Sequence, residues 1–295
     1  MLYVRKIKRH QLNRIILFAC RSKVSKDTRE IMIISTILKP FIRSIFPLRI
    51  LQIIKKIYYV RLLKSFSEEN IINFKIIKQL ISPGDYVVDI GSNIGVYTKY
   101  LSELVGVQGC VYSIEPISHT FEILCSNVRK LKLRNVVLIN YAISDKDSTV
   151  TMGIPSYKSG GENYYRARIV HGDTNKLLRR EKVKSRTIDT LLAGLPYDIS
   201  FLKCDVEGHE LQCIKGAIKV LEKSKPACFI EITGNPDDPK STASEVFKLL
   251  KEKGYEAYYF DGKNLEKRRK GDKSINYFFL KSAHLRLLQG QDCLK

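Results

Sequence analysis

The sequence predicts an α/β protein built on a doubly wound, mainly parallel sheet of about seven strands. Two observations support this prediction. From about residue 70 to residue 282, short apolar runs alternate with amphipathic segments of roughly 10–15 residues, which is typical of crossover units in which a helix follows each strand. The chain has 295 residues, of which 44% are hydrophobic, so it is long enough to bury a sizeable core.

Each expected strand is a short apolar run bounded by turn residues. These runs are residues 86–90, 110–115, 135–140, 199–205, 227–232, 256–261 and 275–280. The last two are joined by a polar turn without a helix, which favours an antiparallel pair at the edge of the sheet. Amphipathic spacing predicts the helices between the strands. These helices cover residues 70–81, 95–105, 119–132, 210–223 and 241–254.

Charge sets the first 64 residues apart from the rest of the chain. They contain sixteen Lys and Arg but only two Asp and Glu, a net charge of +14, whereas the whole chain carries +21. Apolar residues spaced by three or four positions predict an amphipathic helix in this segment. These residues are Phe46, Ile50, Ile53, Ile57 and Val60. Three hypotheses stay open for the helix: packing on the main domain, binding to an anionic membrane surface, and contact with nucleic acid.

These signals also predict the domain boundaries. We expect a basic, helical N-terminal extension at residues 1–64, a main domain at residues 65–285, and a short tail at residues 286–295. Ser65 and Glu68 have the spacing of a capping box before the first helix of the main domain. Pro83 and Gly84 then mark the end of that helix.

Cysteine usage and the N-terminal sequence indicate the compartment. The seven cysteines are scattered and include no C-x-x-C pair, which favours reduced thiols over a disulfide framework or a zinc site. The first residues mix charges into every apolar run, unlike a secretory signal. The uncharged run at residues 31–38 is far shorter than the roughly 20 residues of a spanning helix. We therefore expect a cytoplasmic protein, with peripheral membrane contact as an open alternative.

The first clue to function is the sequence YVVDIGSNIGVYT at residues 86–98. Gly91 permits a tight turn out of the strand, and Gly95 allows the next helix to begin close to a ligand. Asn93, between them, tolerates a left-handed backbone better than most residues do. In doubly wound sheets, ligands bind at the carboxyl ends of the strands. The segment is therefore either a ligand-binding loop or a plain tight turn.

Glu115 favours a nucleoside ligand. It ends the second strand, where an acid is placed to accept hydrogen bonds from the two ribose hydroxyls. A dinucleotide loop would read G-x-G-x-x-G, whereas here Asn93 replaces the middle glycine and no glycine follows Gly95 before Gly106. Asp89 would repel a phosphate but would attract an ammonium or a sulfonium group. The sequence therefore predicts S-adenosylmethionine as the ligand.

Five motifs together resemble the FkbM-type S-adenosylmethionine-dependent methyltransferases over roughly residues 70–282. They are VVDIGSNIG, IEP, NYAISD, LKCDVEGHELQCIKGA and FIEI, of which the part KCDVEGHE is the most specific. The resemblance implies a Rossmann-like class I methyltransferase fold and transfer of a methyl group to a hydroxyl oxygen. It implies nothing about residues 1–64.

The resemblance also implies a set of cofactor-binding residues. They are Asp89, Gly91, Asn93, Gly95, Glu115, Ala142, Ile143 and Asp205. The first four would hold the methionine and ribose end of the cofactor, and Glu115 would accept hydrogen bonds from the ribose hydroxyls. Ala142 and Ile143 would border the adenine. Asp205 would lie near the methyl group.

Methylation of a hydroxyl requires a group that takes its proton, and such a base contributes about 10²–10⁴-fold to the rate. The candidates for this role follow the fourth and fifth strands. They are Asp205, Glu207, His209 and Glu231. An alternative is that these carboxylates and the histidine hold a hard divalent metal ion. Glu210 has a second alternative, which is to cap the helix that follows it.

We expect the acceptor to be a small molecule, a sugar or glycan, or a lipid-linked hydroxyl compound. Residues 151–186 are longer than an ordinary connection and are candidates for a lid or substrate wall, in which Tyr164, Tyr165 and Arg166 could clamp a sugar-like or acidic acceptor. A nucleic-acid methyltransferase is the second hypothesis. The acidic stretch DVEG, where amino methylases of DNA carry (D/N)-P-P-(Y/F), argues against it because carboxylates repel phosphates. The third hypothesis is a cofactor-binding module without catalysis.

Overall fold

The computed structural model describes residues 48–66, 71–156, 162–170, 172 and 179–289. The chain divides into two compact units, residues 1–53 and 54–295. Helix α3 (Leu48–Ser65) confirms a helix in the basic segment. Phe46 lies outside the described residues, and whether the segment contacts a membrane, nucleic acid or the core stays a prediction.

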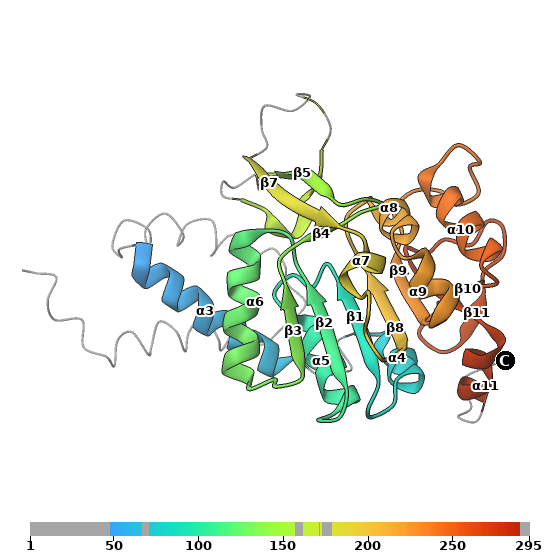
Figure 1. Cartoon of the computed structure of the whole chain (residues 1–295), viewed down its shortest axis with the longest axis horizontal. Helices are drawn as coiled ribbons and strands as arrows, with labels where there is room; N and C mark the ends of the chain where they lie inside the picture. The colour runs from blue at the N-terminus through green and yellow to red at the C-terminus, as the bar shows by residue number, and fades with distance from the viewer. Residues whose placement is uncertain (1–47, 67–70, 157–161, 171, 173–178, 290–295) are drawn as a thin grey trace, which may run out of the picture. The chain divides into compact units, whose positions relative to one another are not determined.

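Within residues 54–295, the described strands form a large sheet of eight strands in the order β11-β10-β12-β9-β8-β1-β2-β3 (Figure 1). The bounds are β1 (Tyr86–Ile90), β2 (Cys110–Ile114), β3 (Val136–Ile139), β8 (Ile199–Cys204), β9 (Ala227–Glu231), β10 (Glu256–Phe260), β11 (Leu265–Lys267) and β12 (Asn276–Leu280). The five strands from β9 to β3 run parallel, whereas β12 lies antiparallel between β9 and β10. The fold class is therefore the predicted α/β fold of the class I methyltransferase type, with a mixed rather than purely parallel sheet.

Helices cover both faces of this sheet. They are α4 (Phe74–Leu80), α5 (Val96–Val105), α6 (Ser118–Leu131), α7 (Ile188–Leu191), α8 (Glu210–Lys215), α9 (Ile218–Lys223), α10 (Thr242–Glu252) and α11 (Ser282–Gln289). Successive strand residues face opposite sides, so Val88 and Leu202 pack in one cluster with α8, α9 and α10. Val87 and Phe201 pack in a second cluster with α4, α5 and α11. This division explains why the central strands are mostly apolar on both faces.

A second, smaller sheet has the strand order β4-β7-β5-β6 and lies above the large sheet in the view of Figure 1. Its strands are β4 (Ala142–Ile143), β5 (Ser148–Ile154), β6 (Arg168–Ile169) and β7 (Arg179–Arg186). Strands β5 and β7 pair antiparallel from Ser148–Ser185 to Ile154–Arg179. The described part of the region that the sequence predicts as a long connection thus contributes β6, β7 and the end of β5 to this sheet. Its apolar side forms a separate cluster that includes Met152, Ile154 and Val183.

Several local predictions need correction. The last two predicted strands do form an antiparallel pair, β10 and β12, but β12 lies next to β9 and an additional strand, β11, is the outermost described strand. The helix expected at residues 210–223 is two helices, α8 and α9, separated at Gly216. A side chain at position 216 would place its β-carbon 2.0 Å from the carbonyl oxygen of Ser144. The hydroxyl of Ser65 donates to the carbonyl of Leu62 and so belongs to the end of α3, while Glu68 lies outside the described residues.

Two observations concern the predicted environment of the protein. The cysteines in the described ranges, Cys110, Cys125, Cys204, Cys213 and Cys228, are all free thiols, as expected. None of the helices described here is long and apolar enough to cross a bilayer. The expected location stays a prediction.

We expect replacement of Leu101 by alanine to lower the free energy of unfolding by about 2–5 kcal/mol, because this side chain of α5 is 0% exposed and its loss leaves a cavity against the sheet. Leu287→Ala is the matched control, since Leu287 is 56% exposed on α11 and its truncation should change the stability by less than about 0.5 kcal/mol. Urea denaturation of both variants measures the difference. Equal destabilisation by the two substitutions would contradict this packing.

Candidate active site

A pocket opens at the carboxyl ends of β1, β2 and β8, where the small sheet meets the large one. It is lined by most of the predicted site residues. They are Gly91, Asn93, Glu115, Ala142, Ile143, Asp205, Glu207 and His209. Three other predicted residues, Asp89, Gly95 and Glu231, do not line it. The structure therefore gathers residues of four separate sequence motifs at one place.

The loop after β1 has the backbone conformation that the sequence suggests. Gly91, Asn93 and Gly95 have φ angles of +74°, +51° and +94°, all in the left-handed region. A β-carbon at position 91 would lie 1.9 Å from the carbonyl oxygen of Asp205, and one at position 95 would lie 2.8 Å from a methyl group of Leu124. The two glycines therefore allow the loop to approach neighbouring protein segments closely. This reason for glycine at positions 91 and 95 is not visible in the sequence.

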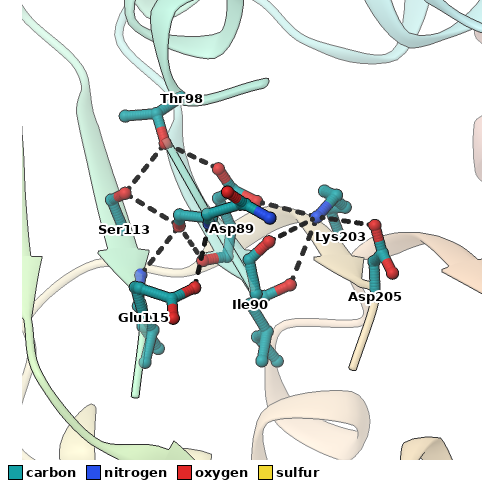
Figure 2. Close-up of polar contacts among 11 residues, drawn as sticks. Asp89, Ile90, Thr98, Ser113, Glu115, Lys203 and Asp205 are labelled. Atoms are coloured by element: carbon teal, nitrogen blue, oxygen red, sulfur yellow. Dashed lines mark hydrogen bonds and ion pairs between the residues drawn. The ribbon is translucent and has the colours of Figure 1, made fainter. Parts of the chain in front are cut away.

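Asp89 is buried beneath this loop. Its side chain is 0% exposed, and its Oδ2 accepts a hydrogen bond of 2.7 Å from the hydroxyl of Thr98 on α5. The Thr98 hydroxyl lies 2.8 Å from that of Ser113 on β2, which donates to the hydroxyl of Ser92. Ser92 in turn donates to the backbone carbonyl of Asp89 at 2.7 Å. Figure 2 shows these contacts, which fix the end of β1 to α5 and β2.

Lys203 of β8 is a site residue that the sequence prediction missed. It is 2% exposed, and its Nζ lies 3.3 Å from Oδ1 of Asp89 and 3.6 Å from Oδ2 of Asp205 (Figure 2). The same ammonium donates to the carbonyl oxygens of Gly91 at 3.1 Å and Ile90 at 3.3 Å. Burial opposes its charge, but the two carboxylates outweigh this effect and raise the pKa of Lys203. The signal in the sequence is a single lysine within the apolar run ISFLKC.

Glu115 follows β2 and lies at the pocket, as predicted. Its Oε2 accepts the backbone N–H of Asn93 and its Oε1 accepts that of Ile117, both at 3.0 Å. Burial raises the pKa of this carboxyl to about 7, although the two amides and the charge of Lys203 oppose the shift. The amides hold the carboxylate in a fixed orientation and leave further lone pairs for a ligand.

The carboxylates of the acidic segment after β8 differ in their burial and in their contacts. Glu210 is buried, and its Oε1 accepts the backbone N–H of Gly208 at 2.8 Å, which supports the capping alternative. Glu207 has a φ angle of +55° and lines the pocket. Burial and the charge of Asp205 raise the pKa of Glu207. The ring Nε2 of His209 lies 3.0 Å from the hydroxyl of Ser144, so the imidazole also links this segment to the chain after β4.

Glu231 ends β9 and is half-buried close to the same acids. Burial, followed by the charges of Asp205 and Glu207, raises the pKa of Glu231 to about 7. Glu231 is outside the pocket lining, and its role in the site stays a prediction.

Residues of the small sheet and its 3₁₀ turn (Tyr164–Arg166) form the opposite wall of the pocket. Tyr164 and Tyr165 both line it. The hydroxyl of Tyr164 donates to Glu162, which also pairs with Arg179 at 3.0 Å. The ring of Tyr164 packs 4.7 Å from that of His119, centroid to centroid. This wall is therefore aromatic and held by defined contacts.

The metal hypothesis concerns the same carboxylates. In the portion of the chain that the structure describes, no group of three or more His, Cys, Asp or Glu side chains is arranged to hold a metal ion. A requirement for a divalent metal thus stays a prediction without an observed ligand set.

Comparison with known proteins identifies the family. The family model described as "Methyltransferase FkbM domain" matches residues 89–257, more than half of the chain. The protein is a member of the FkbM methyltransferase family. The resemblance seen in the motifs is therefore confirmed, and the chain is an S-adenosylmethionine-dependent methyltransferase.

Relatives of this FkbM methyltransferase include a curated protein and solved structures. The hexuronic acid methyltransferase AglP of Haloferax volcanii is 28% identical over 204 residues, which cover 68% of this chain and 74% of that protein. The FkbM methyltransferase structure from Methylobacillus flagellatus is 14% identical with a TM-score of 0.44, and the match covers 78% of this chain but only 60% of that one. A methyltransferase from Aquifex aeolicus is 19% identical with a TM-score of 0.36 over 70% of this chain and 86% of its own.

The residues of the pocket fit S-adenosylmethionine, the methyl donor of the FkbM family. Glu115 presents a fixed carboxylate to the pocket, which suits ribose hydroxyls. Ala142 and Ile143 give an apolar surface, which suits an adenine ring. The carboxylate of Asp205 suits a positively charged ammonium or sulfonium.

The position of Glu115 leads to a test of cofactor binding. Glu115→Gln should weaken S-adenosylmethionine binding by about tenfold or more, because charge-assisted hydrogen bonds contribute roughly 1.5–3 kcal/mol. The affinity of the parent should fall as the pH drops below 7, where this carboxylate with its raised pKa takes up a proton, and the variant should lose that dependence. Calorimetric titration at several pH values measures both effects. Glu122→Gln, at an exposed position of α6, is the control, and parent-like affinity of Glu115→Gln would contradict the assignment.

Proposed function

We propose that this FkbM methyltransferase methylates a hydroxyl oxygen of an acidic sugar, either free or within a glycan. The observation that carries the transfer to a hydroxyl is the group of partly buried carboxylates beside the pocket, Asp205, Glu207 and Glu231. The curated relative, described as a hexuronic acid methyltransferase, supports the class of acceptor. These two lines of support are independent, because one concerns the chemistry and the other the substrate.

The raised pKa of Glu231 suits it to act as a general base. A hydroxyl group must lose its proton as it attacks, and a base is most effective when its pKa lies near the working pH. The pKa of Glu231 is about 7, and that of Glu207 is also raised. Glu231 is thus partly ionised at pH 7, and its carboxylate is a stronger base than that of an exposed glutamate; the raised pKa of Glu207 has the same direction of effect. Glu231 or Glu207 would take the proton of the acceptor hydroxyl.

The same acids favour methylation of a hydroxyl over methylation of the acceptor's own carboxylate. Transfer to a carboxylate would produce a methyl ester and would need no base, but it would bring another negative charge next to Asp205, Glu207 and Glu231. A neutral hydroxyl avoids that repulsion and uses the base that is present. We therefore expect a methyl ether rather than an ester.

The remaining pocket residues receive roles that fit this reaction. We assign Gly91, Asn93 and Glu115 to the ribose and methionine part of S-adenosylmethionine, and Ala142 and Ile143 to its adenine. When bound, S-adenosylmethionine supplies a methyl group on a positively charged sulfur, which Asp205 would stabilise. The aromatic wall of Tyr164 and Tyr165 would lie against the apolar face of a sugar ring.

The acceptor is tested by incubating the protein with methyl-labelled S-adenosylmethionine and either a hexuronic acid, a neutral hexose or oligosaccharides that contain hexuronic acid. We expect label in the uronic acid or the oligosaccharides and little in the neutral hexose. Mild alkali separates the two products, because a methyl ester releases labelled methanol whereas an ether keeps its label. Alkali-labile label would contradict hydroxyl methylation, and label only in the neutral hexose would contradict the acidic acceptor.

The base is tested separately by Glu231→Gln and Glu207→Gln. Removal of the true base should lower the turnover by at least about tenfold and leave the affinity for S-adenosylmethionine within about twofold. In the parent, turnover should rise as the pH increases through 7, because the carboxylate must be ionised, and the variant that removes the base should lose this rise. Glu245→Gln on α10 is the control, since that side chain is 54% exposed. Parent-like turnover in both variants would exclude either carboxylate as the base.

A further inference from the structure

Two loops of the donor pocket meet at a single buried cation. The loop after β1 contributes Gly91 and Asn93 to the pocket, and the segment after β8 contributes Asp205 and Glu207. Between them lies Lys203, whose Nζ contacts backbone oxygens of the first loop and the carboxylate of Asp205 in the second. Lys203 does not line the pocket itself.

The burial of Lys203 needs an explanation, because a lysine removed from water loses several kcal/mol of hydration. A fully apolar side chain at this position would be compatible with the neighbours Leu202 and Cys204, which are both 0% exposed. The ammonium is instead compensated by Asp89, by Asp205 and by two carbonyl oxygens. Its contacts therefore join the end of β1 and Gly91 of the following loop to Asp205 of the acidic segment.

We propose that Lys203 is a positioning residue. Its contacts connect the loop after β1 to the acidic segment after β8 and thereby fix the relative positions of these two walls of the methyl-donor pocket. The proposal depends on donor binding in this pocket but not on the identity of the acceptor. The cation also has an electrostatic consequence, since its charge lowers the pKa values of Glu115 and Glu231. Without it, these two acids would take up protons more readily.

The groups that face Lys203 come from every element around it. They are Asp89 on β1, Tyr97 on α5, Glu115 after β2, Asp205 after β8 and Glu231 on β9. The ring of Tyr97 has its centroid 5.1 Å from the ammonium, and burial raises the pKa of its hydroxyl to about 12, so it contributes no negative charge at neutral pH. The charge of Lys203 lowers the pKa values of Glu115 and Glu231, against the effect of their burial. The neighbours of Lys203 that titrate near neutral pH are therefore Glu115 and Glu231.

The test compares Lys203→Met, which keeps most of the length of the side chain and removes its charge, with Lys99→Met. Lys99 is the matched control because its side chain is only 14% exposed and pairs with Glu103, one turn further along α5. We expect Lys203→Met to bind S-adenosylmethionine at least about tenfold more weakly at pH 7. We also expect its loss of affinity at acidic pH to begin at a higher pH than in the parent. The reason is that a nearby cation no longer stabilises the ionised form of the carboxyl groups. A role in folding alone would lower the stability without moving this pH profile.

Amide hydrogen exchange adds a direct measure of the two loops. Residues 91–95 and 205–209 should both exchange faster in Lys203→Met than in the parent, and neither should change in Lys99→Met. If Lys203→Met fails to fold, the double variant Lys203→Met/Asp89→Asn decides the question, because it leaves no unpaired charge in the core. Affinity within twofold of the parent across pH 6–9, in the single variant or in a folded double variant, would overturn the proposal.

Discussion

The site depends on the burial of one carboxylate, that of Asp89. A charge that is wholly removed from water destabilises a fold by several kcal/mol unless other groups compensate it. Here Thr98 from α5 and Lys203 from β8 do so, while Ser113 from β2 joins through the Thr98 hydroxyl. Each partner comes from a different element, so the compensation also fixes where β1 ends relative to its neighbours.

This arrangement defines what the pocket can bind. Its base is rigid, because the loop after β1 is held by side chains from below and by the carboxylate of Glu115 from the side. Its mouth is acidic, because Asp205 and Glu207 face it. Such a pocket is selective for a positively charged ligand with hydroxyl groups, and the small sheet adds an aromatic and apolar wall opposite the acids.

Much of the fold and site could be predicted because the signals are local. The strand-end acid Glu115 and the left-handed Asn93 are visible in short segments of sequence, and both lie where expected. Lys203 was missed because an apolar strand pattern says nothing about a buried ion pair whose partner is more than one hundred residues away. The small sheet was missed because β7, with the sequence RREKVKSR, exposes one charged face and buries only Val183 and Ser185, so it lacks the apolar run of a core strand. The position of β12 depends on long-range pairing that no local pattern encodes.

The placement of β12 has a consequence for how the chain is made. Strand β9 gains its second neighbour only when residues 276–280 pair with it, about fifty positions later in the sequence. On the ribosome, a nascent chain that has completed β9 therefore carries an open, apolar strand edge until residues 276–280 have emerged. Chains that end before β12 would be prone to associate through this edge. Pairing of β12 thus removes an aggregation-prone edge that the growing chain exposes.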